Sequence, residues 1–167
     1  MTLTEFNSAN TPLATTLLTQ CCAAQAWVAK MVNARPFNTV DEILNAAQAY
    51  WQTMDEANLL AAFSAHPKIG DVNSLHKKFA NTQTLAANEQ SGVNGSTHET
   101  LEALAQANEA YFQKFGFIFI VCATGKSAEH MLNLLNQRLP NNHSTELKNA
   151  AREQAKITAL RLQKLFN

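Results

Sequence analysis

The chain changes character at the stretch Ala65-His66-Pro67-Lys68-Ile69-Gly70-Asp71. An apolar, helix-patterned segment leads into it through Phe63, and a segment richer in Lys, Asn and Gln follows it. Pro67 has no backbone N–H to donate and biases the preceding residue away from the helical region. The stretch therefore predicts that a helix ends near Phe63 and leaves His66 on an irregular turn.

A histidine held at a helix end has two interpretations. Its unperturbed pKa near 6.5 suits acid–base chemistry close to neutral pH. Alternatively, the imidazole of His66 caps the helix or packs against it and has only a structural role. The stretch by itself does not decide between them.

Length and charge limit the classes of function. With 167 residues, of which 46% are hydrophobic, the chain is long enough for one globular domain, which we expect to span residues 1–167. Thirteen basic residues balance thirteen acidic ones. This balance argues against nucleic-acid binding as the main role, because phosphate contacts require a surplus of cations.

The sequence also predicts no contact with membranes. No apolar run approaches the roughly 20 residues that cross a bilayer. Residues 1–10 lack the basic and apolar regions of a signal peptide. We therefore expect a cytoplasmic location.

The cysteines predict neither a metal site nor disulfides. Cys21-Cys22 and Cys122 lie in apolar or alanine-rich sequence and are expected to be small buried side chains. Their spacing matches no zinc motif or disulfide framework. His66, Asp71 and His76 could gather a metal only if the fold brought them together, which their spacing does not require.

Helices are predicted over most of the chain, because alanine is abundant and only four prolines and five glycines interrupt it. Thr39 with Glu42 and Ser96 with Glu99 are predicted capping boxes that begin two helices, and Ser127 and Ser144 are the predicted N-caps of two more. The result is an all-α, single-domain bundle of about eight helices. The predicted helices cover residues 13–30 (as one or two helices), 39–54, 55–63, 74–79, 85–91, 96–115, 127–139 and 144–166.

Residues 117–123 form an apolar run that could pass for a buried strand. No other segment offers a partner strand, and an isolated strand would leave its backbone groups unpaired. We therefore expect an irregular segment buried in the middle of the domain. The following Thr124-Gly125-Lys126-Ser127 resembles the end of a P-loop, but Ile120 stands where that motif needs its first glycine.

The last predicted helix places an arginine on its apolar side. At about 100° per residue, Arg161 falls about 40° from Leu147, within the arc that Thr158 and Leu162 also occupy. A buried guanidinium must be paired or hydrogen-bonded. Arg161 therefore contacts a polar or anionic substrate, or it pairs with a structural carboxylate; both interpretations stay open.

Asn88-Glu89-Gln90 is a further polar cluster, just before Gly92. A carboxylate beside an amide could engage a ligand that carries several N–H and C=O groups in one plane. Such pairs are also common on solvated helix faces. The cluster alone is therefore weak evidence for a site.

Taken together, these motifs resemble those of the OHCU decarboxylase family, named after 2-oxo-4-hydroxy-4-carboxy-5-ureidoimidazoline (OHCU). One position departs from the family pattern: a serine is common three residues before the glutamate, and this chain has Ala86. Alanine has no hydroxyl group, so the resemblance implies no hydroxyl contact to the substrate at this position. The resemblance covers nearly the whole chain, and its motifs are His66 to Asp71, Glu89 to Gly92, Phe115 to Ser127 and Leu160-Arg161-Leu162.

The resemblance implies an all-helical enzyme without cofactor or metal, usually a homodimer. It would decarboxylate OHCU to (S)-allantoin and CO₂, the third step from urate to allantoin in purine catabolism. His66 would be the acid–base residue and Glu89 its catalytic partner. The implied substrate-binding residues are Pro67, Ala86, Gln90, Phe117, Ile118, Phe119, Ile120, Val121, Cys122 and Arg161.

Two alternatives remain. One is a non-catalytic helical interaction module, in which a buried histidine and arginine serve only the structure. The other is a lyase or hydrolase that acts on a related ureido compound.

Overall fold

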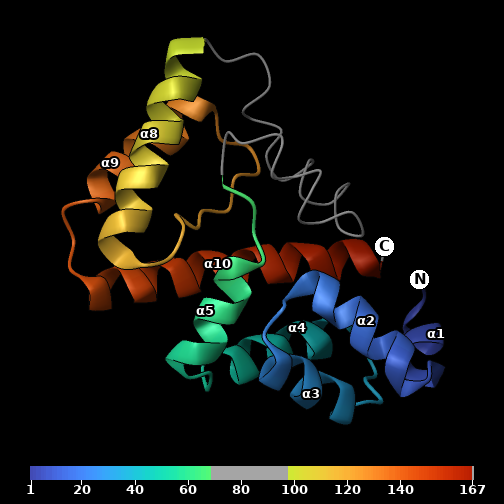
Figure 1. The fold of residues 1–167 in the computed structure, drawn as a ribbon. Helices are drawn as coiled ribbons and strands as arrows, with labels where there is room; N and C mark the ends of the chain where they lie inside the picture. Colours follow the sequence, from blue (N-terminus) through green and yellow to red (C-terminus); the bar gives the residue numbers. More distant parts are fainter. Residues whose placement is uncertain (69–97, 167) are drawn as a thin grey trace. The chain divides into compact units, whose positions relative to one another are not determined.

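The structure, a computed structural model, describes residues 1–68 and 98–166. These residues form eight helices and no strand, so the predicted all-α class is confirmed for them (Figure 1). In this part of the chain, no helix combines the length and the apolar character needed to cross a membrane. The helices predicted at residues 74–79 and 85–91 lie outside the described residues.

The chain divides into two compact units, whose boundaries fall within α5 and α10. Unit 1 comprises Met1–Ala62 and Ala155–Asn167, and unit 2 comprises Phe63–Gln154.

Unit 1 is a group of helices in which α2 packs on α3 and α3 packs on α4. Its core contains the fully buried side chains of Phe6, Leu18, Trp27, Met31 and Ile43. Its elements are α1 (Leu3–Ser8), α2 (Thr11–Cys21), α3 (Gln25–Asn33), α4 (Val40–Trp51), most of α5 (Glu56–Ser64) and the end of α10 (His143–Leu165).

The short helix α1 was not predicted, although the sequence carries its signal. The Thr2 hydroxyl accepts from the Glu5 N–H at 3.2 Å, and the Glu5 carboxylate accepts from the Thr2 N–H at 2.7 Å. The two bonds form a capping box, the motif also predicted at the start of α4. Arg35 donates to the carbonyls of Phe6 and Ala9 at 2.9 and 2.8 Å, which ties α1 to the loop after α3.

Two of the four predicted N-caps are confirmed, and a third, Ser96, lies outside the described residues. The Thr39 hydroxyl accepts from the Glu42 N–H at 3.1 Å, and the Ser127 hydroxyl accepts from the His130 N–H at 3.2 Å. The reciprocal bond at the start of α4 differs from the expected box. The Glu42 carboxylate accepts from the Asn38 N–H at 2.7 Å, one residue before the cap.

The predicted N-cap of the last helix is wrong. α10 begins at His143, before Ser144, and the Asn142 side-chain oxygen accepts from the Thr145 N–H at 2.9 Å. Asn is as good an N-cap as Ser. Because Asn142 precedes Ser144 in the chain and caps the first turn, the helix starts there.

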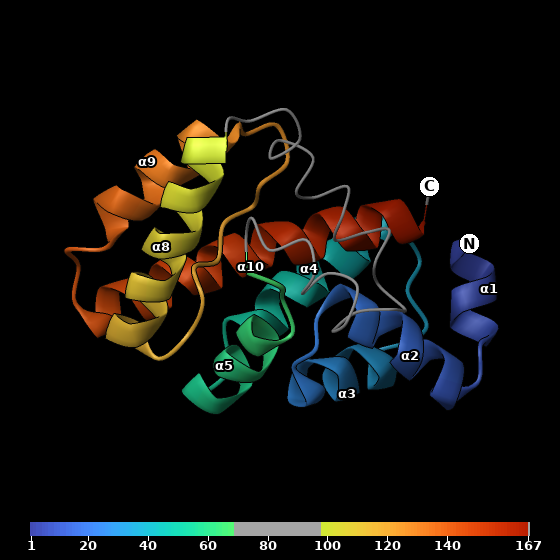
Figure 2. The same ribbon diagram turned by 45° about the horizontal axis from the view of Figure 1, so that its top comes forward.

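Unit 2 contains α8 (His98–Phe115), α9 (Ala128–Arg138) and the first part of α10. α8 and α9 lie side by side in both views (Figure 1 and Figure 2). Residues 117–123, called the irregular segment below, connect them without forming helix or strand, and each is at most 8% exposed. The predicted buried irregular segment is therefore confirmed.

Aromatic rings pack around the irregular segment. The ring of Tyr111 on α8 lies 4.5 Å from that of Phe115, 5.9 Å from Phe117 and 5.4 Å from Phe119, between centroids. Phe63, near the end of α5, lies 5.4 Å from Phe117. Tilted and edge-on rings at such distances attract one another beyond their apolar burial. This packing fixes the aromatic part of the segment in the core of unit 2.

Candidate active site

His66 lies on an irregular turn directly after α5, as the sequence predicts. α5 ends at Ser64, and the His66 N–H donates to the Phe63 carbonyl at 3.1 Å. Pro67 is buried and the His66 side chain is half-buried. The proline thus ends the helix and leaves the imidazole accessible to polar partners.

One such partner is Gln154 of α10. Nε2 of the His66 ring lies 2.6 Å from Oε1 of Gln154, whose side chain is completely buried. Both residues belong to unit 2. The contact connects the turn after α5 to a residue far along the chain.

The same turn is tied to α8. The Lys68 ammonium lies 2.6 Å from the Glu109 carboxylate and 5.0 Å from the centre of the Phe112 ring. Hydrogen bonds from Gln113 and Lys68 hold the pKa of Glu109 below its usual value. The two side chains are 36% and 53% exposed, so solvent screens this ion pair and it adds little stability.

The backbone of the irregular segment finds its hydrogen-bond partners among charged side chains. Arg138 donates to the Ile120 carbonyl at 2.8 Å. The Glu153 carboxylate accepts from the Cys122 N–H at 2.8 Å, and the Lys126 ammonium donates to the Cys122 carbonyl at 2.8 Å. Because the segment belongs to no sheet or helix, these side chains satisfy backbone groups that would be unfavourable to bury unpaired.

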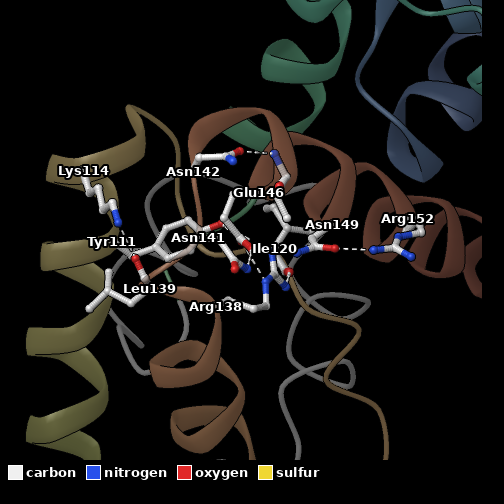
Figure 3. A network of polar contacts seen from close by, with 11 residues as sticks. Tyr111, Lys114, Ile120, Arg138, Leu139, Asn141, Asn142, Glu146, Asn149 and Arg152 are labelled. Atoms are coloured by element: carbon white, nitrogen blue, oxygen red, sulfur yellow. Dashed lines mark hydrogen bonds and ion pairs between the residues drawn. The ribbon is translucent and has the colours of Figure 1, made fainter.

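Glu146 is the centre of the polar network in Figure 3. Its side chain is fully buried on α10. The carboxylate accepts from Tyr111 at 2.5 Å, Arg138 at 2.8 Å, Asn141 at 2.8 Å and Asn149 at 2.7 Å. Burial alone would raise the pKa of Glu146, but these hydrogen bonds and the Arg138 charge hold it below its usual value. Glu146 is therefore a buried anion stabilised by four donors.

Arg138 links this network to the irregular segment. Its guanidinium lies 4.6 Å from the centre of the Phe119 ring while it bonds both Glu146 and the Ile120 carbonyl. Burial and the hydrogen bond to Glu146 raise the pKa of Tyr111, so its hydroxyl stays a donor. Through Arg138, the network thus holds the Ile120 carbonyl and the Phe119 ring of the irregular segment in place.

Arg161 is buried, as the helical wheel predicts, with 8% of its surface exposed. Its Nη1 donates to the carbonyls of Gln20 at 3.2 Å and Cys21 at 3.5 Å, at the C-terminal end of α2. Helix ends of this kind carry partial negative charge and favour cations. From the sequence, the partner of Arg161 was expected to be the substrate or a structural carboxylate. The structure shows a different kind of partner within unit 1, the backbone carbonyls at a helix end.

The structure describes part of the predicted site. In unit 2, two consecutive residues of α10 contact two predicted parts: Gln154 bonds His66, and Glu153 bonds the Cys122 N–H. The described residues contain no group of three or more His, Cys, Asp or Glu side chains that could hold a metal ion. The predicted residues Ala86, Glu89 and Gln90 lie outside the described part, as do Asp71 and His76.

Sequence reasoning missed Gln154, although the wheel contains its signal. At about 100° per residue, Gln154 falls about 20° from Leu147, inside the arc that identified Arg161. The buried side of α10 in fact includes Glu146 and Gln154, whereas Leu147 is only half-buried. A wheel built on apolar residues does not select buried polar ones.

We predict that Glu146→Gln makes stability less dependent on pH. Folding lowers the pKa of Glu146, so the ionised carboxylate stabilises the folded state. This stabilisation is complete at pH values above 4.5, the ordinary pKa of glutamate, and is lost as the pH falls through the pKa of the folded state. At pH 7 the variant should lose about 3 kcal/mol, as when a buried ion pair is broken. Urea unfolding at pH 7 and at pH 3 measures the difference, which should shrink at the lower pH.

Glu129→Gln, at an exposed position of α9, is the matched control and should change stability little at either pH. An equal loss for Glu146→Gln at both pH values would show that ionisation of Glu146 does not stabilise the fold.

Comparison with known proteins relates the chain to OHCU decarboxylases and to uric acid degradation proteins. The OHCU decarboxylase family model matches residues 7–163. The chain is 37% identical over 150 residues to the uric acid degradation bifunctional protein TTL of Arabidopsis thaliana. That match covers 88% of this chain but 45% of the Arabidopsis protein, so the chain spans less than half of that relative's length.

Two further proteins match over most of their length. The 2-oxo-4-hydroxy-4-carboxy-5-ureidoimidazoline decarboxylase of Haloferax volcanii is 28% identical over 142 residues, covering 84% of this chain and 82% of that protein. A crystal structure of OHCU decarboxylase in the presence of (S)-allantoin aligns with a TM-score of 0.74 at 35% identity. It covers 89% of this chain and 95% of that one.

Proposed function

The chain belongs to the OHCU decarboxylase family, and we propose that it decarboxylates OHCU to (S)-allantoin and CO₂. The observation that carries the proposal is His66, a titratable side chain on the turn after α5 that contacts the buried Gln154. A solved relative at 35% identity was crystallised in the presence of (S)-allantoin, the proposed product. The reaction would be the third step from urate to allantoin.

The chemistry sets what the site must do. The bond between the ring carbon and the carboxylate breaks, CO₂ leaves, and the electron pair stays on the ring, where a conjugated group spreads the charge. One proton must then be added to a ring carbon to complete the product. A protein without metal or cofactor stabilises the developing charge with fixed hydrogen-bond donors.

We assign the proton transfer to His66. A group that protonates one face of the ring carbon determines the S configuration, and imidazole is suited to this at neutral pH. Glu89 is the proposed catalytic partner, which orients His66, accepts from ureido or ring N–H groups, or crowds the substrate carboxylate.

The proposed pocket is lined by Pro67, by Ala86 and Gln90, and by the backbone of residues 117–122. Arg161 raises a conflict, because a cation fixed on the carboxylate favours binding but opposes its loss as neutral CO₂. We therefore propose that Arg161 binds a substrate carbonyl or holds the carboxylate loosely.

The family resemblance supports further proposals on organisation. They are a single domain over residues 1–167, a homodimer, a cytoplasmic location and activity without a cofactor. Light scattering coupled to size-exclusion chromatography tests the dimer.

We predict that the protein converts freshly generated OHCU to (S)-allantoin. OHCU also decays spontaneously to racemic allantoin, so the enantiomeric excess of the product is a better measure than its amount. Chiral chromatography with time-resolved circular dichroism measures both. Racemic product at the spontaneous rate would contradict the proposal and favour an interaction module, whereas activity only on another ureido compound would favour a related enzyme.

We predict that His66→Asn lowers kcat by roughly 10²- to 10⁴-fold, the usual contribution of a general acid or base. The far-UV circular dichroism spectrum should stay unchanged, because His66 lies outside the helices. His130→Asn, at an exposed position of α9, is the matched control and should keep wild-type turnover. Near-normal kcat in His66→Asn would remove His66 from the mechanism.

We predict that Glu89→Gln lowers kcat roughly tenfold or more. The loss of one oriented hydrogen bond to a charged group has an effect of this size. The physical reason is that the amide removes the negative charge while it keeps the size of the side chain. Steady-state kinetics on OHCU separates the outcomes, since a rise in KM alone would make Glu89 a binding residue rather than a catalytic one.

A further inference from the structure

In unit 2 the structure describes two parts of the predicted site, the turn with His66 and the irregular segment. Two adjacent side chains of α10 contact them, one each. Gln154 bonds the His66 ring, and Glu153 bonds the Cys122 N–H in the irregular segment. Consecutive side chains of a helix point about 100° apart, so one turn of α10 can engage two separate segments. We propose that Glu153 and Gln154 are a positioning pair for the decarboxylation reaction, an inference that rests on the proposed function.

Gln154 selects the tautomer of His66. Its side-chain oxygen lies 2.6 Å from Nε2 of the ring. An oxygen that carries only lone pairs approaches a nitrogen this closely when a proton lies between them. Nε2 therefore carries a proton in both the neutral and the charged ring, and Nδ1 is the atom at which the ring gains or loses a proton.

The proton balance of the step follows from this assignment. When the C–C bond breaks and CO₂ leaves, the electron pair retained by the ring takes the proton from Nδ1 of the imidazolium. His66 then returns to the neutral ring with its proton on Nε2, and solvent restores the proton on Nδ1. In this assignment Gln154 acts on the reaction through the His66 ring, so it is a positioning residue.

An amide suits this role better than a carboxylate. A carboxylate at the same place would stabilise the imidazolium and oppose the release of its proton. Among the described residues, the charged side chains next to Gln154 and His66 along the chain have partners of their own, since Glu153 bonds the Cys122 N–H and Lys68 pairs with Glu109. Gln154 can thus orient the ring without adding charge.

Glu153 holds the other part of the site. Its carboxylate lies 2.8 Å from the Cys122 nitrogen, and Lys126 lies 2.8 Å from the Cys122 carbonyl oxygen. Hydrogen bonds to charged groups are about twice as strong as neutral ones. The two peptide groups that flank Cys122 are therefore fixed in orientation, and since the Cys122 N–H is bonded to Glu153, any donor to the substrate is a different backbone N–H of the segment.

The tautomer can be tested without any activity measurement. Two-bond ¹H–¹⁵N spectra of the full chain report which ring nitrogen carries the proton, and the His66 signals are those absent from His66→Asn. We expect the Nε2–H form in the wild type and a mixture of tautomers in Gln154→Met, which keeps the side-chain length but removes the amide. An Nδ1–H form in the wild type would overturn the proposal.

Kinetics on OHCU tests the positioning role. Gln154→Met should lower kcat about tenfold, as for other residues that orient a functional imidazole, with KM changed less than about twofold. Gln154→Glu should move the limb of the kcat pH profile that reports His66 to higher pH by about one unit. Glu153→Met should lower kcat about tenfold and reduce the enantiomeric excess, whereas Glu153→Gln, which keeps an acceptor, should restore both.

Gln163 provides matched controls, because it is exposed on the same helix. Gln163→Met and Gln163→Glu should leave kcat and the pH profile unchanged. Equal behaviour of the Gln154 and Gln163 variants would overturn the proposal, and Gln154→Glu serves as the second variant if Gln154→Met fails to fold. If the wild type does not convert OHCU, the proposed function fails, while the spectra still decide the tautomer.

Discussion

A buried stretch of backbone outside helix and sheet must still satisfy its N–H and C=O groups. In unit 2, charged side chains do this for the irregular segment: Arg138 at Ile120, and Glu153 and Lys126 on either side of Cys122. A charged side chain is itself unfavourable to bury without partners. The segment and its charged neighbours therefore stabilise each other, and the rest of the unit is arranged around them.

Glu146 extends this dependence into the core. It holds Arg138 together with Tyr111, and Tyr111 in turn packs against the Phe119 ring of the segment. Removing the Glu146 charge would leave the half-buried Arg138 guanidinium beside an aromatic ring without its ion-pair partner. The stability of the core and the orientation of the Ile120 carbonyl are thus coupled through one guanidinium.

The motif after the segment also has a local explanation. Gly125 adopts φ +74°, a backbone conformation that favours glycine. Lys126 donates to the Cys122 carbonyl, and Ser127 caps α9. The resemblance to the end of a P-loop therefore arises from the turn that leads from a buried segment into a helix, where each of these three residues has a local structural role.

The predictions from sequence succeeded where a local rule applied. Pro67 fixed the end of α5, the lack of a partner strand identified the irregular segment, and the wheel placed Arg161 inside. They failed where burial was polar, as at Gln154, because apolar periodicity gives no weight to amides. The short α1 was missed because six residues are too few for periodicity. Long-range pairs such as His66 with Gln154 depend on tertiary packing, which no local pattern records.

The environment of Arg161 bears on the conflict between binding a carboxylate and releasing CO₂. Its Nη1 is shared by two carbonyls at the end of α2, at 3.2 and 3.5 Å. The partial negative charge of that helix end balances part of the guanidinium charge. A cation balanced in this way stabilises a ground-state carboxylate less than an unshared one would. When CO₂ forms, the attraction between Arg161 and the carboxylate charge is lost. A weaker attraction in the ground state means that this loss raises the barrier less than it would for an unshared guanidinium. These contacts therefore support the proposal that Arg161 binds a carbonyl or holds the carboxylate only loosely.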